Sequence, residues 1–272
     1  MKFNHFVLLL ALIIHSLSVL HAQLTQDNSR YSQINEISDL TCVDNNSPAD
    51  QCFHYLILSV FWSRGLGLLY QLQGKKTRPH LVNQDYWAIH GLWPAVINGN
   101  VPRKCIDQNR RSQFNANHFK NRRDNLYKTL ENRWFNILDI PTENNAIEKF
   151  WRHEYDKHGC CAARAESITN DVGYFKSAIN MYNNINPSTV VKKSGLDIGQ
   201  TALLGTFYDA LIQNIGSKVK IQFVDNRAGT EKYLTEIRVC YDLSLRKIDC
   251  PGYHGPSSID RSFPLRLLSR MP

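Results

Sequence analysis

The stretch CFHYLILSVFWS, residues 52–63, is a run of β-branched, aliphatic and aromatic residues. Turn-prone residues bound it on both sides. An apolar run of this length between turns is typical of a strand that is covered on both faces. The stretch therefore predicts a buried strand, and the other elements of the fold are placed around it.

Further strands follow from the same kind of pattern. YWAIHGLWP, residues 86–94, predicts a second short strand that ends at Gly91 and Pro94. The glycines at 65, 67 and 74, with Pro79, indicate a loop between the first two strands. Three strands are expected near the C-terminus, the last two as a hairpin: residues 218–224, 234–243 and 245–250.

Helical spacing is found between these two groups of strands. Thr142 is expected to cap one helix at its start and Gly159 to end it. The order of strands, helices and strands predicts an α+β fold, with helices packed against a central antiparallel sheet in a single domain. The expected helices are residues 122–135, 142–158, 168–183 and 201–215.

The N-terminus has the layout of a cleaved secretory signal. Lys2 precedes an apolar run over residues 6–14, and small residues follow up to Ala22. His15 interrupts the run, which is shorter than the ~20 apolar residues that a membrane span needs. We expect residues 1–22 to be removed and residues 23–272 to form a secreted domain without a membrane span. A lysosomal or other acidic endomembrane compartment is the alternative.

Export has consequences for cysteines, glycosylation and charge. The chain has seven cysteines, which are expected to pair in an oxidising compartment and to leave one over. Asn45, in Asn-Asn-Ser, becomes a candidate glycan acceptor. The formal charge of +8 falls by one, to +7, when Lys2 is removed. This surplus favours polyanions, but charge alone also fits a basic protein without such a partner.

The segment FWRHEYDKHGCC, residues 150–161, carries most of the titratable chemistry. On a helix, His153, Glu154, Lys157 and His158 lie on one side, within ~140° of one another. A zinc site is one alternative, but the His-Glu-x-x-His pattern has its histidines four apart, whereas these are five apart with a lysine beside the second. A polar helix end whose histidines have surface partners is the other.

His90, in WAIHGLWP, is expected where the strand becomes a turn, a common place for a presented side chain. With His158 it supplies an acid and a base that can face each other across a cleft. One imidazole would remove the proton of an RNA 2′-hydroxyl, and the other would protonate the departing 5′-oxygen. Nearby cations would offset charge on the phosphorus, so no metal or other cofactor is required.

These two segments, WAIHGLWP and FWRHEYDKHGCC, resemble the active-site segments of the ribonuclease T2 family, in order and separation as well as in residues. The resemblance covers roughly residues 52–250. It implies the same α+β fold and an endoribonuclease that cuts single-stranded RNA with little base specificity. The reaction it implies passes through a 2′,3′-cyclic phosphate to 3′-phosphate ends. RNA is then the partner, and we expect a monomer. The alternative is a secreted effector or binding protein that acts through its basic surface.

The resemblance also implies residue roles. His158 would be the general base and His90 the general acid. His153 would hold the phosphate, and Glu154 and Lys157 would stabilise the transition state.

Trp93 resembles the family's stacking platform for a base, with a core tryptophan as the alternative. Ala95 stands where many members carry an acidic residue that touches the base, so base preference is not implied. Tyr155, Cys160 and Phe223 also depart from the common family pattern without removing a catalytic role.

Two disulfides are implied by the resemblance, Cys105–Cys161 and Cys240–Cys250, whereas Cys42–Cys52 is inferred only from proximity. The first bond would hold the His158 helix near the loop after His90 and stabilise the fold by roughly 4 kcal/mol. Cys160 is then left over. It is either buried and inert, which we favour, or it pairs between chains.

Overall fold

The structure is a computed structural model that describes residues 53–97, 113–120, 122–139, 145–163, 165 and 167–271. The chain divides into two units, residues 1–40 and 41–272, and every described residue belongs to the second. Several predictions from the sequence lie outside the described residues: the signal peptide over residues 1–22, the glycan acceptor Asn45, the Cys42–Cys52 pair, Cys105 and the helix cap Thr142.

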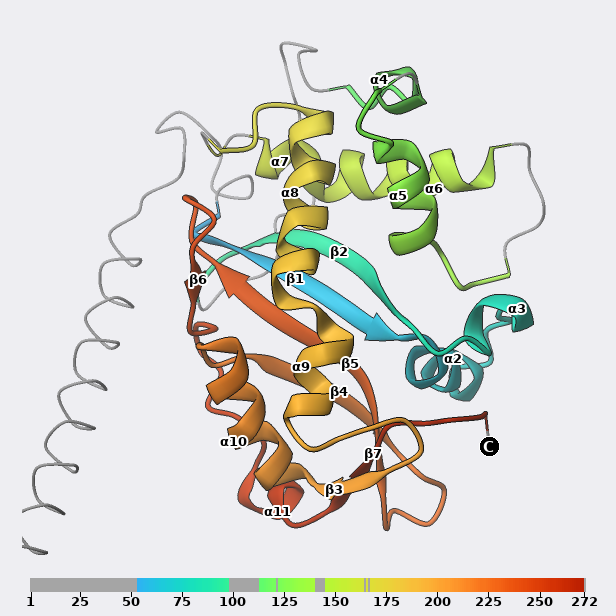
Figure 1. The fold of residues 1–272 in the computed structure, drawn as a ribbon, viewed down its shortest axis with the longest axis vertical. Helices are drawn as coiled ribbons and strands as arrows, with labels where there is room; N and C mark the ends of the chain where they lie inside the picture. The colour runs from blue at the N-terminus through green and yellow to red at the C-terminus, as the bar shows by residue number, and fades with distance from the viewer. Residues whose placement is uncertain are drawn as a thin grey trace, which may run out of the picture. The chain divides into compact units, whose positions relative to one another are not determined.

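A seven-stranded sheet forms the centre of the described fold (Figure 1). Its main path runs β2–β1–β5–β7–β3, and β4 and β6 both pair with β5. All pairs are antiparallel except β5 with β7, so the sheet is antiparallel in its main body and mixed at one edge. The strands are β1 (Tyr55–Trp62), β2 (Trp87–Ala95), β3 (Thr201–Leu203), β4 (Lys220–Asp225), β5 (Lys232–Tyr241), β6 (Lys247–Ile248) and β7 (Pro264–Arg266).

Strand β1 is buried along its whole length, which confirms the prediction from residues 52–63. It lies between β2 and β5. Because side chains alternate along a strand, β1 presents different residues to the two faces of the sheet. Leu56, Leu58 and Val60 pack in the main apolar core, and Phe61 belongs to a second, smaller cluster on the other face.

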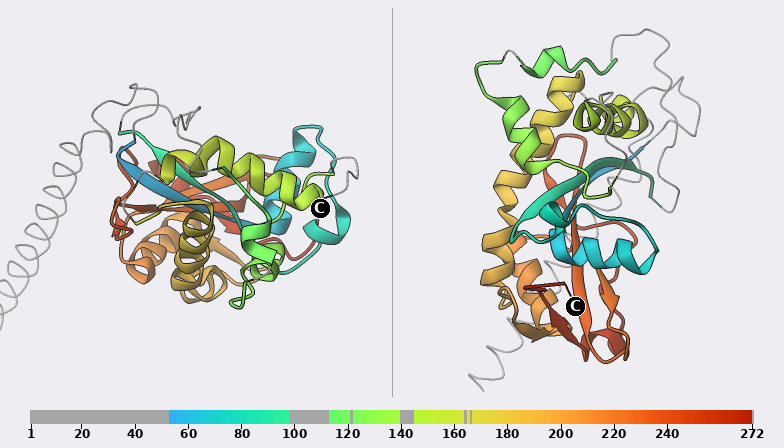
Figure 2. Two further views of the ribbon diagram at one scale, coloured as in Figure 1. Left: turned by 90° about the horizontal axis from the view of Figure 1, so that it is seen from above. Right: turned by 90° about the vertical axis from the view of Figure 1, so that its right-hand side faces the viewer.

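Helices α8 (Asp171–Ile185), α9 (Pro187–Lys193) and α10 (Leu204–Ile215) cover one face of the sheet (Figures 1 and 2). Tyr174 and Tyr182 of α8 donate hydrogen bonds to backbone carbonyls of β2, at 2.8 Å each. The remaining helical elements are α2 (Ser63–Leu72), α3 (Pro79–Val82), α4 (Asn117–Lys120), α5 (Leu126–Arg133), α6 (Ala146–Glu154), the π-helical turn η2 (Tyr155–Gly159), α7 (Cys160–Ala162) and α11 (Ser258–Arg261).

The loop predicted after β1 is wrong over residues 63–72, which form helix α2. A Cβ atom on Gly65 would lie 2.0 Å from the carbonyl oxygen of Leu234, and one on Gly67 would lie 2.6 Å from Cγ1 of Val82. These glycines therefore allow α2 to pack directly on β5 and α3, and they do not break the helix.

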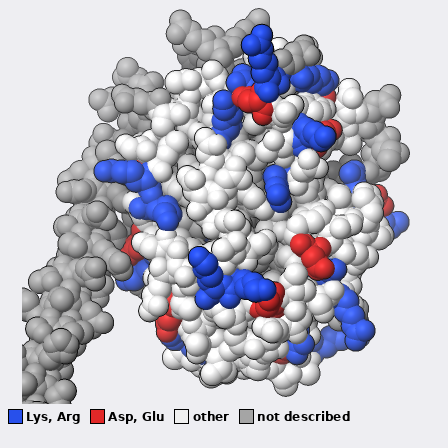
Figure 3. Space-filling model, in the orientation of Figure 1, with Lys and Arg blue, Asp and Glu red and all other residues white. Residues whose placement is uncertain are grey.

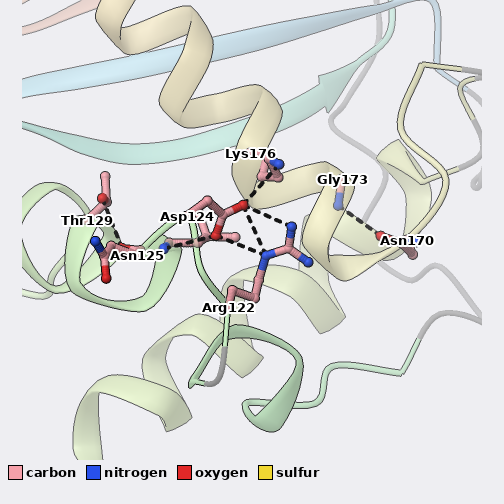
Figure 4. A network of polar contacts seen from close by, with 8 residues as sticks. Arg122, Asp124, Asn125, Thr129, Asn170, Gly173 and Lys176 are labelled. Carbon is pink, nitrogen blue, oxygen red and sulfur yellow. Dashed lines mark hydrogen bonds and ion pairs between the residues drawn. The ribbon is translucent and has the colours of Figure 1, made fainter.

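Helix α5 is shorter than the predicted 122–135 because a polar turn precedes it. The Asp124 carboxylate accepts hydrogen bonds from the Arg122 guanidinium and from the backbone N–H of Leu126, and Lys176 of α8 donates to it at 3.1 Å (Figure 4). Asn125 has a φ of 51°, in the left-handed region, so the helix begins only after it.

Other helix ends also differ from the sequence prediction. Residues 201–203 form strand β3, which pairs with β7, and the predicted helix begins only at Leu204. Helix α8 starts at Asp171, where the side chain of Asn170 accepts from the N–H of Gly173 (Figure 4).

Gly159 does not end the helix that carries the histidines. Its φ is −64°, and the chain stays helical through Ala162. A Cβ atom at this position would lie 2.3 Å from Cδ2 of Tyr155. The glycine is therefore required by close packing against the buried Tyr155 ring and not by a turn.

The described cysteines agree with the sequence prediction where it can be tested. Cys240 and Cys250 form a disulfide that joins β5 to the segment after β6, as predicted. Cys161 is disulfide-bonded to a partner outside the described residues, so its pairing with Cys105 stays a prediction. Cys160 is buried, as we favoured, and its Sγ donates to the carbonyl oxygen of Asp156 at 3.2 Å.

The face of the molecule that carries α8 has no continuous basic patch. Lys and Arg side chains are scattered over it and are interleaved with Asp and Glu (Figure 3). None of the helices in the described ranges is long and apolar enough to cross a bilayer.

Substituting Gly65 with alanine tests the close contact between α2 and β5. We expect Gly65→Ala to lower the free energy of unfolding by about 1–3 kcal/mol, because the backbone of Leu234 cannot move away cheaply. Gly173→Ala is the matched control: its nearest contact would be at 3.5 Å, and alanine is the better helix former. Urea unfolding measures both, and equal midpoints for the two variants would contradict the packing role of Gly65.

Candidate active site

His90 lies at a β-bulge in β2. Ser59 of β1 pairs with Gly91 and Val60 pairs with Ile89, so His90 is the extra residue between them. A bulge of this kind turns a side chain out of the regular alternation of the strand. The ring is held edge-on between the aromatic rings of Phe61 and Trp93, with centroids 6.0 and 5.1 Å away.

The strand predicted over residues 86–94 is confirmed as β2, and it passes through Gly91 without a break. A Cβ atom on Gly91 would lie 2.0 Å from Nε1 of Trp93 and 2.9 Å from Oε2 of Glu154. The glycine thus makes room for the indole and the carboxylate beside His90. Its position in the sequence is explained by this close approach and not by a turn.

The carboxylate of Glu236, on β5, orients His90. Its Oε1 lies 2.5 Å from Nδ1 of His90, and its Oε2 accepts from Ser59 Oγ at 3.0 Å and from the Arg238 guanidinium at 2.8 Å. Burial alone would raise the pKa of Glu236, but its hydrogen bonds with His90 and Arg238 lower that pKa to about 2. The carboxylate therefore stays ionised, and with Nδ1 engaged, Nε2 is the ring nitrogen of His90 left to exchange a proton with a substrate.

The opposite side of the site is built by α6 and η2. His153 and Glu154 lie in the last turn of α6, and Lys157 and His158 lie in the π-helical turn. Such turns inside helices are frequent at functional sites. The sequence places these four side chains on one side of a helix, but nothing in the sequence indicates the π-helical turn.

A cavity of about 650 Å³ lies between α6 and α2. Of the predicted residues, His90, His153, Glu154 and Lys157 line it. Its apolar part is formed by side chains that include Phe61, Phe135, Ile137 and Phe150, and its far wall by Tyr70, Lys75 and Arg78. This volume is in the usual range for a small-ligand site.

His158 is not among the residues that line the cavity. Its ring lies against Trp93, with centroids 5.9 Å apart, and the residue is 8% exposed. Burial, followed by the charges of Lys157, His153 and His90, lowers the pKa of His158 to about 3. Nδ1 is buried and accepts no hydrogen bond from any group in the described part of the chain. The imidazole is therefore neutral in the free protein.

Trp93 connects the two histidines, because both rings contact it. The Arg238 guanidinium lies over the indole at 5.3 Å from its centroid. Trp93 is half-buried, so neither a core role nor base stacking follows from its exposure alone, and its role as a base platform stays a prediction.

Glu154 is almost fully buried, with 7% of its surface exposed. Burial raises the pKa of its carboxyl group, and the charges of His90 and Lys157 oppose that shift. Within the described ranges, no group of three or more His, Cys, Asp or Glu side chains is placed to hold a metal ion.

Four residues of the site were missed by the sequence analysis: Ser59, Tyr70, Glu236 and Arg238. Glu236 and Arg238 could have been found in the sequence, because two charged residues spaced two apart in a predicted strand lie on the same face of the sheet. Tyr70 gave none, because it lies in a segment predicted to be a loop. Burial, then the charges of Glu236 and Glu154, raises the pKa of Tyr70 to about 12, so its hydroxyl stays protonated.

Comparison with known proteins identifies the family of this chain. A family model described as Ribonuclease T2 family matches residues 53–250. The chain belongs to the ribonuclease T2 family. The resemblance noted in the sequence is therefore confirmed.

Curated ribonuclease T2 relatives are found in several animals. Ribonuclease T2 protein rnst-2 of Caenorhabditis elegans is 28% identical over 179 residues, which cover 64% of this chain and 60% of the relative. Ribonuclease T2-A of Mus musculus is 30% identical over 173 residues, which cover 62% of this chain and 61% of the relative. The chain thus spans about three-fifths of the length of these relatives.

Solved ribonuclease T2 structures share the fold. Human RNase T2 aligns with a TM-score of 0.57 at 22% identity, over 79% of this chain and 98% of that one. Ribonuclease MC1 from bitter gourd seeds aligns with a TM-score of 0.57 at 22% identity, over 72% of this chain and 93% of that one. The predicted α+β architecture is confirmed by this agreement.

Titration of His158 tests the effect of its burial. We expect its ring to stay neutral down to pH values well below the ordinary ~6.5, because the folded state disfavours the charged form. Histidine ring NMR measures this directly, and a midpoint near 6.5 would contradict the buried arrangement.

The same shift predicts a pH dependence of stability. An unfolded His158 takes up a proton near ~6.5 and the folded one only near pH 3, so this residue makes the free energy of unfolding fall as pH drops through that window, by up to ~1.4 kcal/mol per pH unit. His158→Asn should flatten the slope of the free energy of unfolding against pH, and an unchanged slope would contradict the burial of His158.

Proposed function

We propose that this chain is an endoribonuclease that cleaves single-stranded RNA by transphosphorylation, first to a 2′,3′-cyclic phosphate and then to 3′-phosphate ends. The observation that carries the proposal is the pair of histidines that contact one tryptophan: His90, fixed by the buried Glu236, and His158, kept neutral by burial. Membership of the ribonuclease T2 family supports it.

In the first step, His158 acts as the general base. It takes the proton of the 2′-hydroxyl as that oxygen forms a bond to phosphorus. A pKa near 3 makes the empty site a weak base, but a phosphate anion beside the ring favours the imidazolium and raises the pKa as the substrate binds.

His90 acts as the general acid in the same step. As the bond between phosphorus and the 5′-oxygen breaks, its electron pair leaves with the oxygen, and the proton from Nε2 of His90 neutralises it. The hydrogen bond from Nδ1 to Glu236 keeps the ring in this orientation throughout. For hydrolysis of the cyclic phosphate the roles reverse: His90 takes a proton from water, and His158 protonates the 2′-oxygen.

The phosphate is held by side chains of α6 and η2. His153 and Lys157 line the cavity next to His90, where they can offset the charge that develops on the phosphoryl oxygens. Glu154 lines the cavity beside them, and we assign it to the same stabilisation of the transition state. None of these steps is assigned to a metal ion.

Substrate selectivity and compartment are part of the same proposal. Ala95 is buried and offers no side-chain hydrogen bond to a base, which suits an enzyme of little base specificity. We propose that the domain over residues 23–272 acts as a monomer after export, with Trp93 stacking on a base. A tomato relative is named Extracellular ribonuclease LE, and a lysosomal location is the alternative.

Removal of either histidine tests the mechanism. His90→Ala and His158→Ala should each lower kcat/KM on RNA by about 10² to 10⁴, and the wild type should release 2′,3′-cyclic phosphate ends in the presence of a chelator. Product analysis by mass spectrometry measures both. Loss of wild-type activity on chelation, or retention of activity in either variant, would contradict the proposal.

Substitution of Glu236 tests how His90 is oriented. Glu236→Gln keeps the shape but removes the charge, and we expect kcat to fall by up to about 10², because the ring of His90 is then held less firmly. Glu231→Gln is the matched control, because Glu231 pairs with Arg266 at the other end of β5. A wild-type kcat in Glu236→Gln would show that the carboxylate does not act on His90.

A further inference from the structure

The wall of the cavity that faces away from α6 carries two cations that the mechanism does not use. Lys75 and Arg78 lie in the connection between α2 and α3, and both line the cavity that His90 and Lys157 also line. Neither side chain forms an ion pair with any carboxylate in the described ranges, and Arg78 is half-buried. They are therefore available to an anionic ligand that enters the cavity.

The connection that carries these cations is held in place by backbone hydrogen bonds. The N–H of Lys75 donates to the carbonyl oxygen of Tyr70 at 2.9 Å, and the N–H of Arg78 donates to that of Ile137 at 2.8 Å. The N–H of Asp139 donates in turn to the carbonyl oxygen of Lys76 at 2.9 Å. The wall is thus fixed to residues 137–139, of which Ile137 and Leu138 line the cavity.

Tyr70 links this wall to the reacting centre. Its hydroxyl group is close enough to Glu236 and Glu154 for their charges to raise its pKa. The Lys75 ammonium lies 4.8 Å from the centre of the same ring, a cation–π contact. Tyr70 therefore contacts Lys75 and lines the same cavity as His90 and Glu154.

Several cations elsewhere on the surface differ from this pair, because they form ion pairs. Arg122 and Lys176 share the carboxylate of Asp124 (Figure 4), and Lys192 of α9 pairs with Asp197. Those charges are already balanced. Lys75 and Arg78 are positive, lie beside an apolar surface and are unbalanced, a combination that suits a nucleotide more than solvent.

We propose that Lys75 and Arg78 form a second phosphate subsite, which binds the phosphate next to the scissile one along the RNA strand. This inference rests on the proposed function. The scissile phosphate would lie at His153 and Lys157, the intervening nucleoside would cross the apolar surface of Phe61 and Ile137, and the flanking phosphate would reach the far wall. The substrate class is thus an RNA strand with a phosphate on either side of the nucleoside in the cavity.

Binding of uncleavable ligands tests this subsite independently of activity. The probes are the 2′-deoxy dinucleotide dUpdU and the same molecule with an additional 3′-phosphate or 5′-phosphate, because either end could supply the flanking group. Calorimetry at low salt measures the dissociation constants for the wild type, for the Lys75→Gln, Arg78→Gln double variant and for Lys76→Gln. Lys76 is the matched control, since it is an exposed cation of the same connection that does not line the cavity.

We expect one of the two additional phosphates to tighten binding to the wild type and to Lys76→Gln by about tenfold. In the double variant this increment should disappear, so that the phosphorylated and unphosphorylated probes bind equally. The subsite is wrong if neither phosphate tightens binding to the wild type, if the increment survives in the double variant, or if Lys76→Gln loses it as well.

Cleavage assays on the matching ribonucleotides separate this inference from the proposed function. If the wild type cleaves UpU and depends on His90 and His158, but gains nothing from a terminal phosphate, the function stands and the subsite is wrong. If the phosphate increment behaves as expected in the binding experiment but no RNA is cleaved, the proposed function is wrong and the anion subsite stands.

Discussion

The site depends on one buried contact, the hydrogen bond between Nδ1 of His90 and the Glu236 carboxylate. The Glu236 carboxylate is 3% exposed, and burying a charge destabilises the fold unless the charge is compensated. Here His90, Arg238 and Ser59 form hydrogen bonds with its two oxygens. The contact joins β2 to β5 across β1. It therefore needs the order β2–β1–β5 and a small side chain at position 59 of the central strand.

The same constraint explains the local sequence around His90. The bulge at His90 turns the ring toward Glu236, and Gly91 leaves the space that the Trp93 indole and the Glu154 carboxylate occupy. Trp93 then contacts both histidines. Residues that looked like a strand end in the sequence are parts of one packed unit, in which each side chain restricts the position of the next.

The parts of the fold that the sequence predicts well are those set by local pattern. The apolar run of β1, the C-terminal hairpin with its disulfide and the helical position of His153 to His158 all follow from spacing. Helix α2 could not be found in this way, because Gly65 and Gly67 indicate a break until the approach of Leu234 and Val82 is known. The π-helical turn and the continuation past Gly159 likewise depend on the Tyr155 ring, a tertiary contact.

The residues of the candidate site likewise divide into those found from a local sequence pattern and those found only from the tertiary structure. His90, His153, Glu154, Lys157 and His158 were found because they fall in two short segments. Glu236 is 146 residues from His90 in the chain, and only the register of three strands brings the two together. The far wall with Lys75 and Arg78 depends on the α2–α3 connection pairing with residues 137–139, which no local pattern reveals.

A crystal structure with an uncleavable 2′-deoxy dinucleotide tests the central claim most directly, because the two histidines must flank one phosphorus. The account predicts Nε2 of His90 within about 3 Å of the 5′-oxygen and a ring nitrogen of His158 facing the 2′-position, with His153 and Lys157 on the phosphoryl oxygens. A phosphate bound beyond the reach of either imidazole, or a His158 ring that stays covered by Trp93 in the complex, would contradict it.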